Sequence, residues 1–76
     1  MKLREFNFNS LKSPFRLTNL SVRMETSPGE YGPWYEGCGI GETLKMLPLE
    51  FADAEIKETR WFFDTFVIEL KGGNMA

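Results

Sequence analysis

The sequence predicts a mainly β fold: a small antiparallel sheet or partly open barrel of four to five short strands, with one long loop rich in glycine, proline and aromatic residues. Three observations lead to this prediction. Apolar and polar residues alternate along several segments, seven glycines and four prolines interrupt the chain, and 76 residues leave room for one domain. We expect residues 1–71 to form this domain and residues 72–76 to form a flexible tail.

The first third of the chain predicts two extended segments. Residues 2–8 place two phenylalanines two positions apart with polar residues between them, the period of a half-buried strand. A turn is expected at residues 9–14, where serine, asparagine and proline disfavour regular structure. Apolar and polar residues then alternate over 15–18 and again over 20–25, but the parity shifts at Asn19, which predicts a β-bulge or a tight bend.

Residues 26–41 predict an ordered loop. Glycine and proline are too frequent there for a helix or a long strand, yet the segment also carries three aromatic residues. We expect a short strand near residues 34–36 within this loop. Residues 42–47 contain helix-forming residues, but they run into Pro48, so at most one or two helical turns fit.

The last third of the chain predicts a closing β-hairpin made of residues 49–58 and 64–71. Residues 61–70 are rich in aromatic and β-branched residues, with Phe62 on the same parity as the apolar residues that follow it. Residues 49–60 fit both a helical and a strand period, so the alternative is an α+β fold with a helix at 49–60. The hairpin is preferred because it provides the final strand with a partner.

The net charge of −2 conceals an asymmetry. Residues 1–25 hold five Lys or Arg against two Glu, a net charge of +3, whereas residues 26–76 hold four against nine Asp or Glu, a net charge of −5. Two interpretations are open. The sheet has a basic and an acidic side that attract different partners, or opposite charges pair across neighbouring strands.

Residue types that carry cofactor and metal chemistry are scarce. The chain has no histidine and one cysteine, Cys38, so neither an internal disulfide nor a typical zinc site can form. The glycine-rich residues 37–41 lack the Lys-Ser/Thr of a phosphate-binding loop and precede Glu42, so we expect an irregular turn. We therefore expect no cofactor and no metal ion.

Catalytic groups are equally scarce. Cys38 has no histidine to activate it as a nucleophile, and we expect a small semi-buried apolar residue there. One group of carboxylates lacks the spacing of a calcium-binding loop, and we expect a solvated face for it: Glu50, Asp53, Glu55 and Glu58. The sequence therefore predicts a protein that is not an enzyme.

Two aromatic clusters predict a partner-binding surface. Large amphipathic rings bury much area with little loss of conformational entropy, and they dominate the energetics of many interfaces. The first cluster is Tyr31, Trp34 and Tyr35, and its competing interpretation is a loop that caps the small core. The second cluster is residues 61–63, which would form an apolar patch beside an open sheet edge. The candidate partner-binding residues are Tyr31, Trp34, Tyr35, Trp61 and Phe63.

We predict from these features a non-enzymatic protein-interaction module that acts by occupying a partner surface or by self-association, as small accessory proteins of phages and mobile elements often do. The alternative is a small nucleic-acid-binding module that uses the basic residues Lys2, Arg4, Lys12, Arg16 and Arg23. The lone cysteine indicates a reducing compartment, so we expect a cytoplasmic protein. No apolar stretch approaches the roughly 20 residues needed to span a membrane.

Overall fold

The computed structural model describes residues 1–10 and 18–72, and these residues contain one five-stranded mixed sheet. The long strand β1 lies inside the sheet, with β5 parallel to it on one side and the short strands β2 and β3 antiparallel to it on the other. Strand β4 pairs antiparallel with β5 and forms an edge. The strands are β1 (Asn19–Ser27), β2 (Glu30–Tyr31), β3 (Tyr35–Gly37), β4 (Ile56–Phe62) and β5 (Thr65–Leu70).

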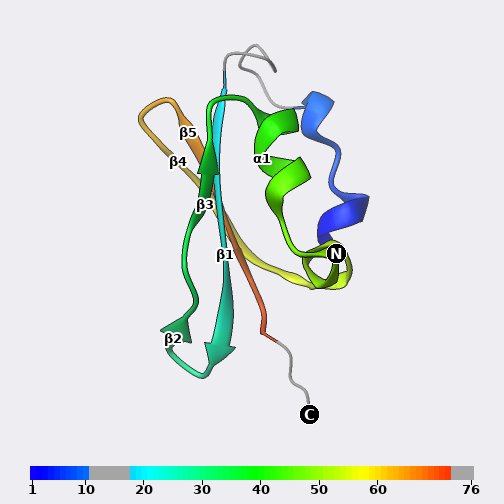
Figure 1. The fold of residues 1–76 in the computed structure, drawn as a ribbon, viewed down its shortest axis with the longest axis vertical. Helices are drawn as coiled ribbons and strands as arrows, with labels where there is room; N and C mark the ends of the chain where they lie inside the picture. Colours follow the sequence, from blue (N-terminus) through cyan, green and yellow to red (C-terminus); the bar gives the residue numbers. More distant parts are fainter. Residues whose placement is uncertain (11–17, 73–76) are drawn as a thin grey trace.

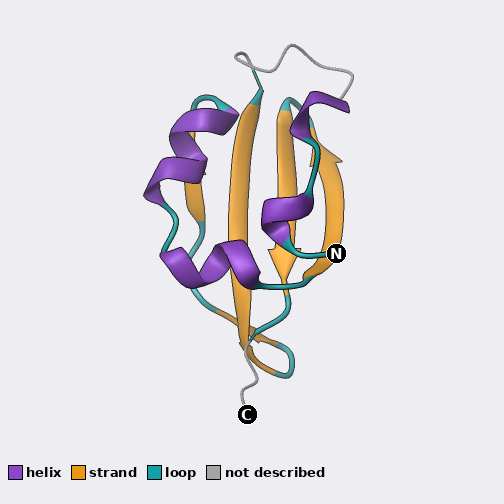
Figure 2. Cartoon of the chain, turned by 90° about the vertical axis from the view of Figure 1, so that its right-hand side faces the viewer, coloured by secondary structure: helices purple, strands orange, loops and turns teal. Residues whose placement is uncertain are grey.

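Short helical segments cover one face of this sheet (Figure 1). The N-terminal pair lies on the same face of the sheet as the helical segments that connect β3 to β4 (Figure 2). Within the described residues no helix lies on the opposite face, which we call the open face. The helical segments are α1 (Ile40–Met46) and the 3₁₀ helices η1 (Leu3–Glu5), η2 (Phe8–Ser10) and η4 (Leu49–Asp53).

The core lies between the sheet and the helical layer. Strand β1 alternates as predicted, with Leu20 and Val22 fully buried towards the helices and Arg23 on the open face. The apolar residues of β5 at every second position are buried on the same helical side. The buried cluster consists of Leu3, Leu20, Val22, Ile40, Phe51, Phe66, Ile68 and Leu70.

The predicted mainly β fold with an open sheet and a structured loop is confirmed. The short strand expected near residues 34–36 is β3, and α1 has two turns that end before Pro48. Gly39 precedes α1 with a φ of 110°, a conformation that other residues rarely adopt. The expectation of a purely antiparallel sheet is wrong for one pair, because β1 and β5 run parallel.

The strand predicted at residues 2–8 is wrong. The backbone N–H of Glu5 donates to the Lys2 carbonyl at 2.9 Å, which closes a 3₁₀ turn, and the Lys2 N–H donates to the Glu5 carboxylate at 2.9 Å, which caps that turn. The Leu3 N–H donates to the Ala54 carbonyl at 2.9 Å. Phe6 therefore stacks down onto the sheet, 5.7 Å from the ring centroid of Phe66, although its spacing from the next phenylalanine is that of a strand. The parity shift predicted at Asn19 lies at the boundary of the described residues, and the segment 15–17 lies outside them.

The closing hairpin is confirmed, but its first strand and its turn lie elsewhere than predicted. Residues 49–53 form η4, so the first half of the expected strand is a 3₁₀ helix, and no helix spans 49–60. The turn falls at residues 63–64, where Phe62 pairs with Thr65. Because the chain reverses there, Phe62 lies on the open face and not on the core side that its parity predicted.

Candidate protein-binding surface

The structure separates the predicted aromatic loop into two parts. Tyr31 and Trp34 lie over the open face, where both rings contact Arg23. Tyr35 begins β3 and turns to the helical side, where its ring meets Phe51 edge-on at 5.3 Å. The loop therefore caps the core with one ring and presents the other two on the opposite side of the sheet.

Arg23 is held between these two rings on the open face. Its guanidinium carbon lies 3.9 Å from the ring centroid of Tyr31 and 4.4 Å from that of Trp34, which is the geometry of a cation–π sandwich. Its Nε also donates to the Glu69 carboxylate at 3.0 Å. The loop aromatics are therefore fixed by a charged residue in the middle of the sheet.

Glu69 is the buried anion beneath this cluster, with 4% of its surface exposed. Arg23 pairs with it from β1 and Arg60 pairs with it from β4 at 3.3 Å, so two guanidinium groups share one carboxylate. Burial raises the pKa of Glu69, but hydrogen bonds from the two arginines lower it by more than burial raises it. The pKa of Glu69 therefore lies below its ordinary value. The carboxylate is thus satisfied within the chain.

Lys57 extends this charged network along the open face. Its Nζ donates to the Tyr31 hydroxyl at 2.7 Å and to the Glu25 carboxylate at 3.2 Å. Hydrogen bonds to Tyr31 and Glu25 raise the pKa of Lys57. The Gly29 backbone N–H and Lys57 lower the pKa of Glu25. Most charged groups at this end of the open face are therefore already paired.

A shallow hollow of about 430 Å³ lies beside the network, between Trp34 and Phe62. Its floor is made by Ser21 and Val67, both buried in the sheet, and Arg60 contributes a charged wall. Both rings lie on the open face, but they come from opposite edges of the sheet, one from the loop and one from the hairpin. Glu36 and Thr65 also line the hollow, so its walls are partly aromatic and partly polar. Aromatic rings beside a guanidinium group are typical of a surface that binds a partner side chain.

The tip of the β4–β5 hairpin carries the most exposed aromatic residues of the described chain. Trp61 is 43% exposed on the helical side, where its ring lies 5.0 Å from that of Phe66. Phe62 is 62% exposed on the open face, and Phe63 is 87% exposed in the turn, with its ring 4.7 Å from that of Phe62. We call Trp61, Phe62 and Phe63 the hairpin tip.

Sequence reasoning missed Phe62 because it placed the turn too early. The signal was Asp64, since aspartate favours turns and a two-residue turn at 63–64 leaves Phe62 opposite Thr65.

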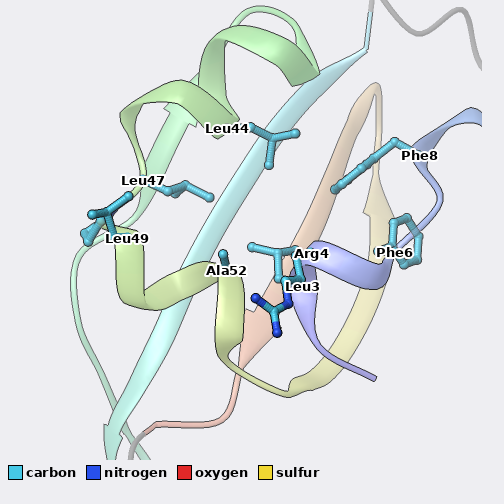
Figure 3. Close-up of a pocket in the computed structure, with 9 residues that line it drawn as sticks. Leu3, Arg4, Phe6, Phe8, Leu44, Leu47, Leu49 and Ala52 are labelled. Carbon is cyan, nitrogen blue, oxygen red and sulfur yellow. The ribbon is translucent and has the colours of Figure 1, made fainter.

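An apolar groove of about 310 Å³ crosses the helical side (Figure 3). Arg4 lies at this groove, and its guanidinium pairs with Asp53 at 2.9 Å. Leu49 stands at the opposite end and is 92% exposed. The apolar lining comes from Leu3, Phe6 and Phe8 on one side and from Leu44, Leu47 and Leu49 on the other.

The glycine-rich and acidic segments bring no metal-ligating cluster together in the described residues. Cys38 is exposed beside the start of α1, where a semi-buried position was expected. No group of three or more cysteine, aspartate or glutamate side chains within residues 1–10 and 18–72 could hold a metal ion. Among the predicted carboxylates, Asp53 pairs with Arg4 and Glu55 pairs with the N-terminal ammonium at 2.9 Å.

The basic residues named for nucleic-acid binding do not share one face. Arg4 lies at the apolar groove and pairs with Asp53, whereas Arg23 lies on the open face and pairs with Glu69. The backbone of Lys2 forms an isolated antiparallel β-bridge with Glu55, the residue just before β4 at the edge of the sheet. Lys12 and Arg16 lie outside the described residues.

Comparison with known proteins finds no family model, no curated protein and no solved structure that matches this chain. In the described part of the chain, the helices are too short and too polar to cross a membrane.

Proposed function

We propose that this protein is a non-enzymatic interaction module that binds a protein partner through the hairpin tip and the adjoining open face. The single cysteine keeps the reducing cytoplasm as the proposed compartment. Binding would occupy the partner surface, and no covalent step is required.

The backbone of Phe63 carries this proposal. Phe63 has a φ of 58°, the only positive φ of a non-glycine residue within the described chain. As the first residue of a two-residue hairpin turn it occupies a position that favours glycine, and a bulky side chain there costs about 1 kcal/mol or more. Its ring is 87% exposed, so burial does not offset this cost. A partner that covers the ring supplies the missing reason for phenylalanine at this position.

The neighbouring rings make the hairpin tip a surface rather than a single exposed side chain. Phe62 packs edge-on against Phe63 and also forms one wall of the hollow that Trp34 closes from the other side. Aromatic residues gathered in this way supply most of the binding energy at many interfaces.

The pairing of the basic residues supports a protein partner over the nucleic-acid alternative. Phosphate binding needs arginine and lysine side chains that are available to the backbone of the nucleic acid. Arg4 and Arg23 are instead engaged with Asp53 and Glu69, and the net charge of the chain is negative.

Phe63→Gly tests the proposal because the substitution should raise the stability of the protein and lower its binding to the partner. Glycine relieves the backbone strain, so we expect the free energy of unfolding to rise by about 1 kcal/mol. Binding to the partner should fall, since the exposed ring is lost. The measurement compares urea unfolding with affinity capture from the source cell, using wild-type and Phe63→Gly chains as bait.

Leu49→Gly is the matched control, because Leu49 is also an almost fully exposed apolar residue but lies on the helical side. Proteins that wild type and Leu49→Gly retain, and that Phe63→Gly loses, are the expected partners. Equal capture by wild type and Phe63→Gly would contradict the proposal.

A further inference from the structure

We propose that β4 is the seam of a symmetric dimer, in which the edge strands of two copies pair antiparallel with Thr59 opposite Thr59 of the second copy. This inference rests on the proposed function, because it names a second copy of this chain as a partner. It concerns the backbone edge of the hairpin, whereas the test above concerns the ring of Phe63.

Strand β4 has one unpaired edge within the described residues. One side of this strand pairs with β5. On its other side, within residues 1–10 and 18–72, the chain makes only a bridge between Lys2 and Glu55 and a hydrogen bond from the Ile56 N–H to the Met1 carbonyl at 2.8 Å. An exposed edge of this length is a template for another strand.

Two-fold symmetry restricts the register in which two β4 strands can pair. A two-fold axis perpendicular to the sheet keeps the helical layers of both copies on the same side. Residues directly opposite in an antiparallel pair point to the same face, so each residue must meet one from its own face. Near the middle of the free edge, the residue on the axis is then Glu58, Thr59 or Arg60.

Charge complementarity separates these three registers. With Glu58 on the axis two carboxylates face each other, and with Arg60 on the axis two guanidinium groups face each other. With Thr59 on the axis, Glu58 of each copy faces Arg60 of the other. Opposite charges in directly opposed positions stabilise a strand pair and like charges destabilise it, so only this register is favoured.

The side chains concerned are exposed at the seam, and Arg60 pairs with Glu69 through one nitrogen, Nη2, which leaves its Nη1 on the Glu58 side. The Glu58 side chain is 57% exposed and the Arg60 side chain 43% exposed, and within one copy the Arg60 Nη1 lies 3.9 Å from the Glu58 Oε2. The four side chains would form a square of alternating charge on the open face. Lys57 is excluded from this pairing because a register shift between Ile56 and Glu58 leaves it unpaired with β5, and its ammonium group binds Glu25.

Light scattering over a concentration series tests whether the dimer forms. We expect the molar mass to rise from 8.8 kDa towards twice that value. Glu58→Arg should raise the dissociation constant at least about tenfold, because the introduced guanidinium group would face Arg60 of the second copy. Glu50→Arg is the matched control, since it makes the same charge change on η4, away from the seam, and should leave the dissociation constant unchanged.

Mixing two variants tests the register directly. Arg60→Glu should also weaken self-association, yet a mixture of the Glu58→Arg and Arg60→Glu chains should form a heterodimer, because both opposed pairs then carry opposite charges. Arg60 also pairs with Glu69, so circular dichroism must first show that the Arg60→Glu chain is folded.

A cysteine scan gives an independent measure that keeps Arg60 in place. In a Cys38→Ser background, Thr59→Cys should form an intermolecular disulfide under mild oxidation, because opposed Cα atoms lie about 4.5–5.5 Å apart. Glu58→Cys should form it far more slowly. A mass that stays at 8.8 kDa, or a disulfide at position 58 in preference to 59, would overturn this inference without affecting the result for Phe63.

Discussion

Arg23 and Glu69 lie directly opposite each other on the parallel strands β1 and β5, and the Arg23 Nε donates to the Glu69 carboxylate at 3.0 Å. This pair joins residues that are 46 positions apart and lies below the aromatic rings of the loop. It therefore links the fold of the sheet to the surface that we propose binds a partner.

Loss of this carboxylate should destabilise the protein strongly. In Glu69→Ala two guanidinium groups lose a buried partner, and breaking such a pair lowers the free energy of unfolding by about 2–4 kcal/mol. Urea unfolding followed by tryptophan fluorescence measures this change. Glu58→Ala removes an exposed carboxylate from the same face and should have almost no effect on the monomer, so similar losses in the two variants would contradict a special role for Glu69.

Stability should fall on acidification, and Glu69 should account for part of that fall. Its pKa is lower in the folded state than its ordinary value of 4.5, so the unfolded chain binds more protons at acidic pH. The resulting stabilisation is fully present above the unfolded pKa and is lost as the pH drops through the folded pKa. Unfolding midpoints in urea measured between about pH 7 and about pH 2.5 should therefore decrease below about pH 4.5.

The Glu69→Gln variant isolates this contribution. Its midpoint should depend less steeply on pH than that of wild type over the same range, although some dependence will persist. The pKa of Glu25 is lowered by the Gly29 N–H and Lys57, and the pKa of Glu55 by the N-terminal ammonium. Identical slopes for wild type and Glu69→Gln would show that Glu69 does not titrate differently in the two states.

Two neighbouring aromatic residues should respond differently to truncation. Trp34→Ala removes a ring that is 38% exposed and stacks on Arg23, so we expect a loss of about 1 kcal/mol in the free energy of unfolding. Tyr35→Ala opens the core beside Phe51 and should cost about 2 kcal/mol or more. Chemical denaturation of both variants tests whether Tyr35 belongs to the core and Trp34 to the surface. A larger loss of stability for Trp34→Ala than for Tyr35→Ala would contradict this assignment.

Alanine substitutions at two glycines near α1 should change the free energy of unfolding in opposite directions. A Cβ at Gly41 would meet nothing within 4 Å, so Gly41→Ala should raise the free energy of unfolding by about 0.5–1 kcal/mol through helix propensity. A Cβ at Gly37 would lie 2.6 Å from Oγ1 of the fully buried Thr43, so Gly37→Ala should lower it by about 1–3 kcal/mol. Melting temperatures of the two variants on either side of wild type are the expected result.

Local pattern was sufficient where one face of an element is buried and the other is not. The alternation along residues 20–25 predicted β1 because burial on one face imposes a period of two. Pro48 predicted the end of α1 because it lacks the N–H that a helix requires. Pattern was insufficient for residues 2–8, since two phenylalanines two apart also suit a pair of 3₁₀ turns that pack onto a sheet.

Sequence alone is enough to predict the fold class, the strands β1 and β5, the short helix and the aromatic character of the surface, because periodicity, proline positions and composition act over a few neighbouring residues. Tertiary structure alone decided that β1 and β5 run parallel, that Tyr35 caps the core while Trp34 faces outward, and that the turn falls at Phe63. These features depend on contacts between distant segments, such as Arg23 with Glu69, whose combined free energy outweighs the local preference for glycine in the turn.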